Sequence, residues 1–548
     1  MSTEITTYRS AMTALELYVE QVHQVVAKAT MKEGKVIPEL ADQHQRILHG
    51  YAWIISTSTA LNVLLRWAES LQESGSFRPV EQLSVQIAFG EYLAQIVGGL
   101  AMGQNEVVRP ADFGLTTEAN NLSSHGAVAD LLSSGNTAKT RRALAEQCRD
   151  GVFASESLGD DFIDAARDQY RRFTNERIIP HAHKWHLNND LIPDQTVTEL
   201  AQMGTFGICI PEEFGGLGLG KLAMSVVTEE LSRGWIGAGS LGTRSEIAGE
   251  LILLGGTAEQ HAQWLPGIAN GDVLPTAVFT EPDVGSDMGS LTTRAVKTDT
   301  GWKIKGNKTW ITHASRSDLM TLMARSKPDV KGYAGLSMFL VPKPRGTEEE
   351  AFPAQGLSGT EIEVLGYRGM REYELAFDDF PLKENALLGG EQGNGFKQLM
   401  KTFEGARIQT AARAVGVARR SLELGLSYAL DRKQFKRPLF DFPRVSDKIA
   451  MMAVDTLLAR ELTYFAAREK DKGRRCDIEA GMSKLLAAKA AWTSADASLQ
   501  IHGGNGYSLE YEISRVLCDA RILNIFEGAG EIQAQVVARG LLMQRRST

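Results

Sequence analysis

The chain has 548 residues, of which 43% are hydrophobic and 23% are charged. At roughly 100–200 residues per domain, this length corresponds to about three or four domains, and the composition argues against intrinsic disorder. The formal net charge of −8 gives the chain no overall attraction for nucleic acid or anionic lipid, so an anionic ligand requires a local positive site. The four cysteines lie far apart without a C-x-x-C pair, which excludes a disulfide framework and a cysteine-rich zinc site.

The N-terminal segment lacks the basic start and apolar run of a signal or transit peptide. The most apolar stretch, residues 53–67, contains four hydroxyl side chains and an arginine, so it is too polar and too short to span a bilayer. We therefore expect a cytoplasmic protein that binds neither membranes nor nucleic acid.

Apolar residues recur at helical spacing in residues 49–71 and 81–102, and polar or glycine-containing breaks separate these segments. We expect residues 1–155 to form an N-terminal helical extension and residues 156–275 to form a second helical domain. The extension contains no cluster of candidate catalytic residues. We therefore expect it to cover the core helices or to shape a subunit interface.

The hydrophobic period changes after Gly271. Alternating segments such as residues 301–306 and short apolar runs such as residues 336–341 predict a β domain over residues 276–392.

Helical spacing returns after Gly395, for example in residues 451–465, and predicts a C-terminal helical domain over residues 393–548. This order of segments predicts a mostly α-helical protein with an inserted β domain.

The first of three segments with candidate functional side chains is VFTEPDVGSD (278–287), which is followed by KTWIT (308–312). The turn at Gly285 and Ser286 offers N–H groups and a hydroxyl to an anion or a ring edge, and Trp310 places an aromatic plane near the Thr312 hydroxyl. For the glycine turn alone, a plain turn that leads into a strand is the commoner structure.

The second segment, QIHGGNG (500–506), follows a long helix. Its glycines permit close approach of a ligand, and the same pattern fits a helix C-cap. The third segment, NIFEGAG (524–530), opens the last helix. Its Glu527 is either a favourable charge at a helix N-terminus or a base in an apolar pocket, where desolvation raises the proton affinity.

The order and spacing of these segments resemble the acyl-CoA dehydrogenase family of flavoproteins from about residue 156 to the C-terminus. IPEEFGGLGL (210–219), residues 366–368 and DRKQF (431–435) carry the same resemblance, and we expect the last of these to be helical. The resemblance implies a helical domain, a β-barrel-like middle domain and a C-terminal four-helix bundle, here with the extra N-terminal extension. It also implies a homodimer or homotetramer that binds FAD and an acyl-CoA substrate and passes electrons to an electron-transferring flavoprotein.

By this resemblance, FAD lies between the middle and C-terminal domains, and the neighbouring subunit completes its pyrophosphate and adenine site. No metal is expected. The residues expected to contact FAD are Phe279, Thr280, Gly285, Ser286, Trp310, Thr312, Arg432, Gln434, Phe435, Gln500, Gly503, Gly504, Ala529 and Glu531. The residues expected to contact the substrate are Arg244, Ser286, Arg407 and Gly528.

The resemblance also implies that Glu527 is the catalytic base, which removes the proton α to the thioester carbonyl while a hydride leaves the β carbon for flavin N5. Some relatives carry the base one residue before the arginine of the segment FEGAR (403–407). Ala406 occupies that position and cannot accept a proton, and Glu404 lies on a different helix face. The developing enolate requires hydrogen-bond donors, which the resemblance assigns to the backbone N–H of Glu527 and a ribityl hydroxyl of FAD.

Arg244 lies in the helical segment that lines the acyl pocket in this family. An arginine in an apolar pocket requires an anion, such as a distal substrate carboxylate, whereas a surface arginine on the same helix is the alternative. His313 and Arg316 are other candidates for this role.

With its length and its N-terminal extension, the chain resembles long bacterial members of the family, and this resemblance implies oxidation of 2-methylsuccinyl-CoA to mesaconyl-CoA in the ethylmalonyl-CoA pathway. Glutaryl-CoA or short- and branched-chain acyl-CoA oxidation are the alternatives. A DNA-associated flavoprotein of the same fold is an alternative of another class, and the negative net charge and Glu527 argue against it.

Overall fold

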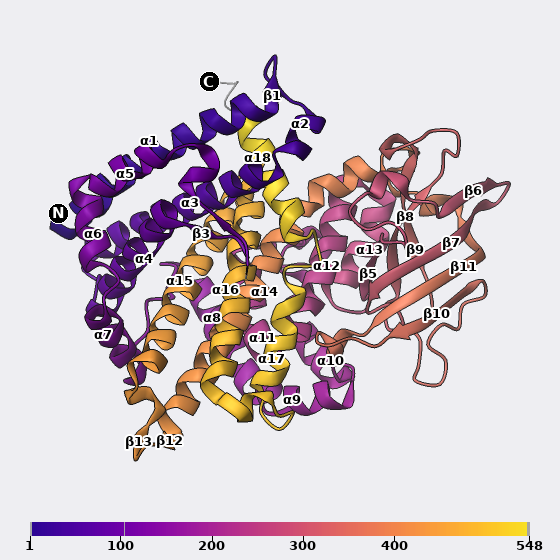
Figure 1. Cartoon of the computed structure of the whole chain (residues 1–548). Coiled ribbons are helices and arrows are strands. Elements are labelled where there is room, and N and C mark those ends of the chain that lie inside the picture. The colour runs from indigo at the N-terminus through magenta and orange to yellow at the C-terminus, as the bar shows by residue number, and fades with distance from the viewer. Residues whose placement is uncertain (1–2, 104, 545–548) are drawn as a thin grey trace. The chain divides into compact units, whose positions relative to one another are not determined.

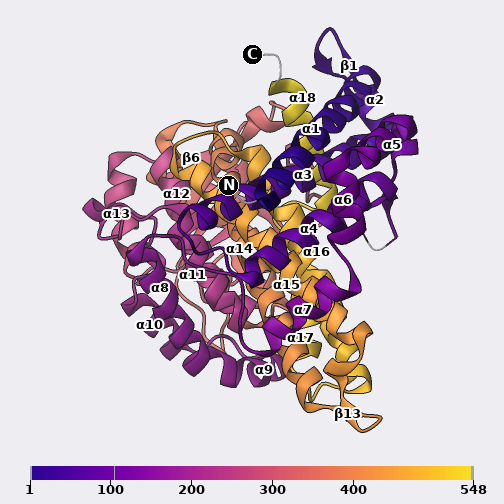
Figure 2. The same ribbon diagram turned by 90° about the vertical axis from the view of Figure 1, so that its left-hand side faces the viewer.

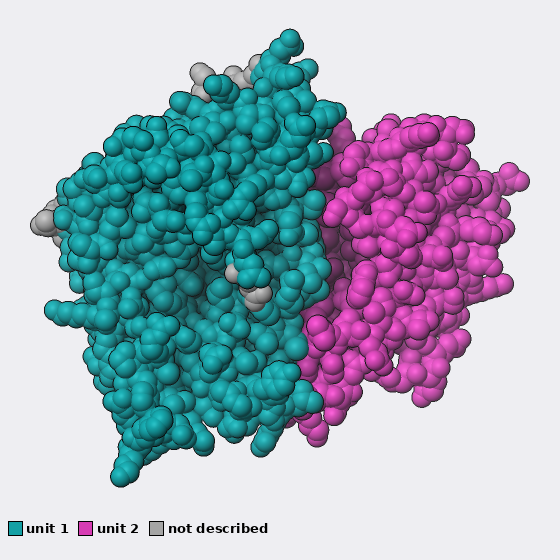
Figure 3. All heavy atoms as spheres, viewed as in Figure 1, with its two compact units in different colours: residues 1–164, 410–548 teal, residues 165–409 magenta. Residues whose placement is uncertain are grey.

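The computed structural model describes residues 3–103 and 105–544. The chain divides into two compact units, which are residues 1–164 together with 410–548 (unit 1) and residues 165–409 (unit 2) (Figure 3). Unit 1 is mainly helical, and unit 2 combines helices with a seven-stranded sheet, so the predicted mostly helical fold with a β domain is confirmed. Within the described ranges, no helix is long and apolar enough to cross a membrane.

The N-terminal part of unit 1 consists of helices joined by short turns and two β-ribbons. Pro38 and Pro79 lie in the first turns of their helices, where a missing N–H costs no hydrogen bond. Thr137 caps another helix, since its hydroxyl accepts the N–H of Thr140. The helices are α1 (Thr3–Thr30), α2 (Pro38–Gln43), α3 (Gln45–Glu73), α4 (Pro79–Gly98), α5 (Thr116–Ser124), α6 (Gly126–Ser134) and α7 (Ala138–Arg149). The ribbons pair β1 (Met31–Lys32) with β2 (Lys35–Val36) and β3 (Leu100–Ala101) with β4 (Val107–Val108).

The C-terminal part of unit 1 is a set of long helices around α16, which packs against α15, α17 and α18 (Figure 1). The helices are α14 (Gly395–Asp431), whose first part belongs to unit 2, α15 (Pro443–Asp471), α16 (Asp477–His502), α17 (Ile513–Ile522) and α18 (Gly530–Gln544). Between α14 and α15 lies a hairpin of β12 (Lys433–Gln434) and β13 (Arg437–Pro438).

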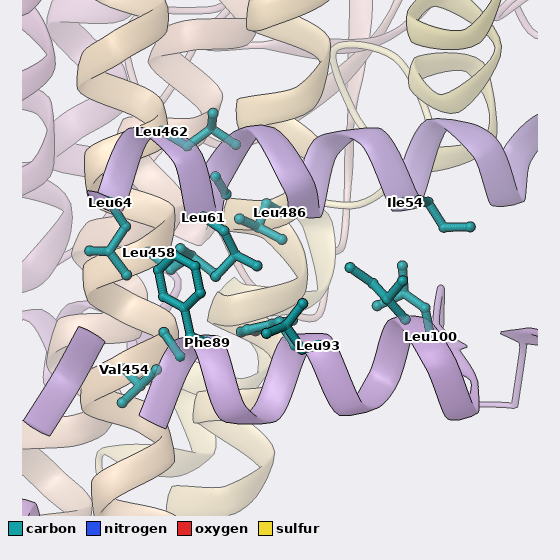
Figure 4. Close-up of a cluster of buried hydrophobic side chains, with 14 of the residues drawn as sticks. Ile54, Leu61, Leu64, Phe89, Leu93, Leu100, Val454, Leu458, Leu462 and Leu486 are labelled. Atoms are coloured by element: carbon teal, nitrogen blue, oxygen red, sulfur yellow. The ribbon is translucent and has the colours of Figure 1, made fainter. Parts of the chain in front are cut away.

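One hydrophobic core joins the N-terminal and C-terminal parts of unit 1. Leu61 of α3 and Phe89 of α4 are fully buried in the same cluster as Leu458 of α15 (Figure 4). Helix α3 packs against α15, α16 and α18, and α4 packs against α15 (Figure 2). The Tyr92 hydroxyl also donates a hydrogen bond of 2.8 Å to Asp455. Each buried leucine or phenylalanine contributes about 1.5–3 kcal/mol. The extension therefore packs directly on the C-terminal helices.

Unit 2 begins with helices that precede the sheet. Helix α12 is apolar around most of its circumference and almost wholly buried, as expected of an interior helix. Gly239 permits this packing against α11, because a Cβ there would meet the Ser232 Oγ at 2.0 Å. The helices are α8 (Asp161–Phe173), α9 (Ile179–Asn188), α10 (Asp194–Gln202), α11 (Lys221–Gly234), α12 (Ile236–Gly255) and α13 (Ala258–Ala269).

The sheet of unit 2 has the strand order β10-β11-β7-β6-β8-β5, and β9 pairs antiparallel with β8. Strands β7 and β11 alternate buried and exposed residues over much of their length, whereas β8 and β9 are buried almost throughout, which is typical of strands covered on both faces. The strands are β5 (Pro275–Val278), β6 (Arg294–Thr298), β7 (Gly301–Thr312), β8 (Leu319–Arg325), β9 (Leu336–Pro342), β10 (Leu357–Ile362) and β11 (Glu372–Lys383).

The register of β7 against β11 shifts between Tyr373 and Leu375, so two residues of β7 lie opposite one residue of β11. This bulge includes Trp310, which has a φ of 57° and an exposed side chain. Bulges redirect side chains at functional sites.

The expectation that DRKQF is helical is wrong. Helix α14 ends at Asp431, and Lys433 and Gln434 form β12 of the hairpin. Phe435 and Lys436 make the tight turn, with φ of 51° and 66°, which a helix does not permit. The pairing of the two short strands therefore overrides the helical pattern of the preceding residues.

Replacing Leu61 by alanine is expected to lower the free energy of unfolding by about 2–5 kcal/mol, because it opens a cavity in the core of unit 1. Leu17→Ala is the matched control, since Leu17 is 68% exposed, and it is expected to change stability by less than about 0.5 kcal/mol. Urea unfolding followed by circular dichroism measures both. Equal effects of the two variants would contradict the shared core.

Candidate functional site

Glu527 lies in the turn between α17 and α18, and its side chain is 15% exposed. Its backbone has a φ of 52°, a left-handed conformation that costs a non-glycine residue about 1–3 kcal/mol and is found where the surroundings enforce it. Nη2 of the fully buried Arg413 donates to Oε2 of Glu527 at 2.6 Å, and the Thr410 hydroxyl donates to the same oxygen. A neighbouring cation favours the ionised carboxylate, which is the form that accepts a proton.

The contacts of the Glu527 carboxylate with Arg413 and Thr410 are polar, so the apolar pocket considered for this residue stays a prediction for its remaining surroundings. The Phe526 ring lies against the guanidinium of Arg413, 4.7 Å from its carbon, rather than forming an apolar wall around the carboxylate. The site is polar and cationic at this point.

Two buried side chains hold the backbone around Glu527. Nζ of Lys484, on α16, donates to the carbonyl oxygen of Phe526 at 3.1 Å and to that of Gly528. Nε2 of Gln533, on α18, lies 3.5 Å from the carbonyl oxygen of Glu527. Gly528 has a φ of 95°, and a Cβ there would come within 2.0 Å of Nε2 of Gln533, so this position requires glycine.

Five of the predicted residues, Arg432, Gln434, Gln500, Gly503 and Gly504, line one pocket of about 600 Å³ in unit 1. Arg444 and Lys448 of α15 line it as well, and no carboxylate is found among its described lining residues. Arginine and lysine side chains bind phosphate groups, so the pocket fits the pyrophosphate of a dinucleotide.

The helix-cap alternative for residues 500–506 is also correct, since α16 ends at His502 and the N–H of Gly503 bonds back to the Gln500 carbonyl. Phe435 is 87% exposed and is not part of the pocket lining. Ala529 and Glu531 lie at the start of α18, and Glu531 is exposed.

In unit 2, a buried ion pair holds the segment that contains Phe279, Thr280, Gly285 and Ser286. Nζ of Lys308 lies 3.0 Å from Oε1 of Glu281 and donates to the carbonyl oxygen of Phe279 at 2.8 Å. Both Gly285 and Ser286 are exposed on the turn that follows.

The pKa values reflect this pairing. Burial opposes the ionised form of Glu281, but the charge of Lys308 and hydrogen bonds from Thr292 and Thr293 lower the pKa to about 2. Burial lowers the pKa of Lys308 to about 8, although the carboxylate of Glu281 acts in the opposite direction.

Thr312 is paired with Glu372 across β7 and β11, and its hydroxyl donates to the two carboxylate oxygens at 2.8 and 3.0 Å. Burial raises the pKa of Glu372 to about 7, whereas the Thr312 hydrogen bond and the charge of Arg244 lower it. The exposed Trp310 lies two residues before Thr312 on the same strand. The C-terminal end of β7 thus carries an exposed aromatic ring and a buried hydroxyl.

Arg244 lies on α12 and is only 8% exposed, so the surface alternative for this residue is wrong. Burial and the charges of Arg316, Arg345, Lys343 and Arg244 lower the pKa of His313 well below its usual range. Neither ring nitrogen of His313, nor Nε and Nη2 of Arg316, has a hydrogen-bond partner among the described residues. Asp194 accepts from Nη1 of Arg316 at 3.0 Å, and the buried Nε and Nη2 of the same guanidinium fit an additional anionic ligand. Arg407 of α14 is also buried, and its guanidinium lies 5.6 Å from the centre of the Phe403 ring.

The sequence reasoning missed four residues that contact the predicted ones, namely Thr410, Arg413, Lys484 and Glu372. A signal was present for two of them. Arg413 interrupts the stretch AARAVGVA (411–418), and Lys484 lies in AGMSKLLAAKAA (480–491). An isolated charge with small or apolar residues on both sides in a long helix indicates a buried, partnered side chain.

Comparison with known proteins matches the chain to three domains of one family. Residues 162–272 match the acyl-CoA dehydrogenase N-terminal domain, residues 276–380 the middle domain and residues 393–542 the C-terminal domain.

Similar proteins include (2S)-methylsuccinyl-CoA dehydrogenase from Cereibacter sphaeroides, which is 54% identical over 98% of both chains. The structure of butyryl-CoA dehydrogenase from Megasphaera elsdenii superposes with a TM-score of 0.66 at 29% identity and covers 71% of this chain and 100% of its own. The structure described as PigA with FAD and proline has a TM-score of 0.65 at 25% identity, with the same coverage.

Lys308→Met is expected to destabilise the protein by about 3–5 kcal/mol, because it leaves Glu281 buried without its cation. The second change Glu281→Gln in the same chain is expected to recover part of this loss. As a control, Lys305→Met removes an exposed pair, whose side chains are 67% and 86% exposed, and is expected to cost less than about 1 kcal/mol. Thermal unfolding at neutral pH measures all three. A Lys308→Met variant as stable as Lys305→Met would contradict the structural role of the pair.

Proposed function

Because the chain belongs to the acyl-CoA dehydrogenase family, we propose that it oxidises 2-methylsuccinyl-CoA to mesaconyl-CoA. The observation that carries this proposal is the 54% identity to a methylsuccinyl-CoA dehydrogenase over nearly the whole of both chains, N-terminal extension included. The solved butyryl-CoA dehydrogenase matches only 71% of this chain.

Family members bind FAD, and the residues of this chain fit that cofactor. In the proposal, the cationic pocket of Arg432, Arg444 and Lys448 holds the pyrophosphate end of the FAD that the neighbouring subunit binds. Thr280, Ser286, Trp310 and Thr312 contact the flavin or its phosphates. When bound, FAD supplies the acceptor for the hydride that leaves the β carbon of the substrate.

The chain's own part in the reaction is proton removal and orientation. The ionised carboxylate of Glu527 takes the α-proton, and the electron pair of that C–H bond forms the new double bond as the hydride leaves. Negative charge develops on the thioester oxygen, so a preorganised N–H donor there lowers the barrier. We assign that donor to the backbone N–H of Glu527.

A dicarboxylic thioester also requires a cation for its distal carboxylate. The buried Arg244, whose positive charge acts on His313, supports this assignment.

The proposal includes a homodimer or homotetramer in the cytoplasm and an electron-transferring flavoprotein as the electron acceptor. The exposed Phe435 and the pocket beside it support contact with a second subunit. The division of the chain at residues 155, 275 and 392 remains a prediction, and the shared core of unit 1 supports a packing role for residues 1–155.

Glu527→Gln is expected to lower turnover of 2-methylsuccinyl-CoA by about 10²–10⁴-fold, because an amide does not accept the α-proton. The variant should keep its flavin absorbance, which shows that the cofactor site is intact. Glu404→Gln, which changes an acid outside the proposed site, is the control and should keep the parent rate. Turnover is measured with an artificial electron acceptor. A folded, FAD-containing Glu527→Gln variant with the parent rate would overturn the mechanism.

Arg244→Met is expected to lower kcat/KM for 2-methylsuccinyl-CoA by about 10²-fold, within the range for truncating one partner of a buried charge pair. The value for butyryl-CoA, which has no distal carboxylate, should change much less. Bleaching of the flavin spectrum on addition of each thioester gives an independent reading of substrate preference. Parent enzyme that prefers butyryl-CoA would defeat the dicarboxylate proposal, and equal losses for both thioesters would defeat the role of Arg244.

A further inference from the structure

Lys484 makes a contact that the reaction described above does not require. Its side chain is 1% exposed, and its ammonium group holds the carbonyl oxygens of Phe526 and Gly528, on either side of Glu527. Placing an ammonium group in a protein interior costs several kcal/mol unless its protons are bound. Because burying the ammonium group costs free energy, its place beside Glu527, whose backbone is left-handed, indicates a functional role for Lys484.

The geometry of the peptide bond shows what that task is. The peptide group between Phe526 and Glu527 is planar and trans, so its C=O and N–H point in opposite directions. The Phe526 carbonyl points to Lys484, and the N–H of Glu527 therefore points away from Lys484. A cation on the carbonyl also polarises the amide and strengthens its N–H as a donor.

We propose that Lys484 is a positioning residue that aims the backbone N–H of Glu527 at the thioester oxygen by holding the Phe526 carbonyl. The inference depends on the proposed function, in which that N–H stabilises the developing enolate. Lys484 acts through the backbone and does not itself touch the substrate. Its second contact, to Gly528, holds the other side of the turn, so that Glu527 keeps its left-handed conformation.

The same helix provides a matched control. Lys489, five residues further along α16, also donates to a backbone carbonyl, that of Ala101, and its ammonium lies 5.3 Å from the centre of the Trp53 ring. It therefore serves the contact with the N-terminal extension. Replacing a lysine that only stabilises unit 1, such as Lys489, should leave the polarisation of the bound thioester carbonyl unchanged. Replacing a positioning lysine should reduce that polarisation.

The experiment uses full-length enzyme with bound FAD and the variants Lys484→Met, Lys484→Gln and Lys489→Met. Isotope-edited infrared spectra of mesaconyl-CoA with ¹³C at the thioester carbonyl report how strongly the enzyme polarises that bond. Donors to the oxygen lower the stretching frequency. The kcat and KM for 2-methylsuccinyl-CoA and the affinity for mesaconyl-CoA are measured in parallel.

In the parent enzyme and in Lys489→Met, the carbonyl frequency should shift to lower values on binding. In Lys484→Met most of this shift should be lost, and kcat should fall by about 10–10³-fold, with KM and product affinity changed less than about threefold. If Lys484→Met does not fold, Lys484→Gln is decisive, since its shorter, neutral amide lacks the positive charge. It should also show a smaller shift and a lower kcat.

A folded Lys484→Met or Lys484→Gln variant with the parent carbonyl shift and kcat within threefold of the parent would overturn the inference and leave the proposed function intact. A parent enzyme that neither turns over 2-methylsuccinyl-CoA nor polarises the bound carbonyl would overturn the proposed function, and the inference with it.

Discussion

In the proposed reaction Glu527 removes a proton from carbon and must be held in one orientation, and two buried cations hold it. Arg413 of α14 holds the carboxylate, and Lys484 of α16 holds the backbone on either side. The left-handed backbone at Glu527 persists because these contacts outweigh its intrinsic cost. The position of Glu527 thus depends on charged side chains of two helices and not on the turn alone.

The same arrangement occurs in unit 2, where Lys308 holds both the carboxylate of Glu281 and the carbonyl of Phe279. In both units a lysine with almost no exposed surface reaches main-chain oxygen atoms of a turn that carries predicted ligand-binding residues. A lysine amine provides three donors on a long, flexible stem, so one side chain fixes several backbone groups at once. Such contacts hold an irregular turn in one conformation, which a binding site requires.

The sequence predicted the helical and β regions correctly, because hydrophobic period and turn residues are local signals. Sequence reasoning failed for DRKQF, where the pairing of Lys433 with Pro438 in the hairpin decides the structure. It also missed Arg413 and Glu372, whose importance arises from partners 114 and 60 residues away along the chain. Local patterns carry no information about such distant contacts. Whether Arg244 is buried likewise depends on how α12 packs among its neighbours, and the sequence of the helix alone does not determine that packing.

The core that joins α3 and α4 to α15 is completed only late in translation, because its two parts are far apart in the sequence. Leu61 leaves the ribosome roughly 400 residues before Leu458, and at about 5–20 residues per second that interval lasts on the order of 20–80 s. During this time the newly made helices carry an apolar face whose partners have not yet been translated. Such a surface invites aggregation, so early synthesis is the stage at which molecular chaperones have most to protect.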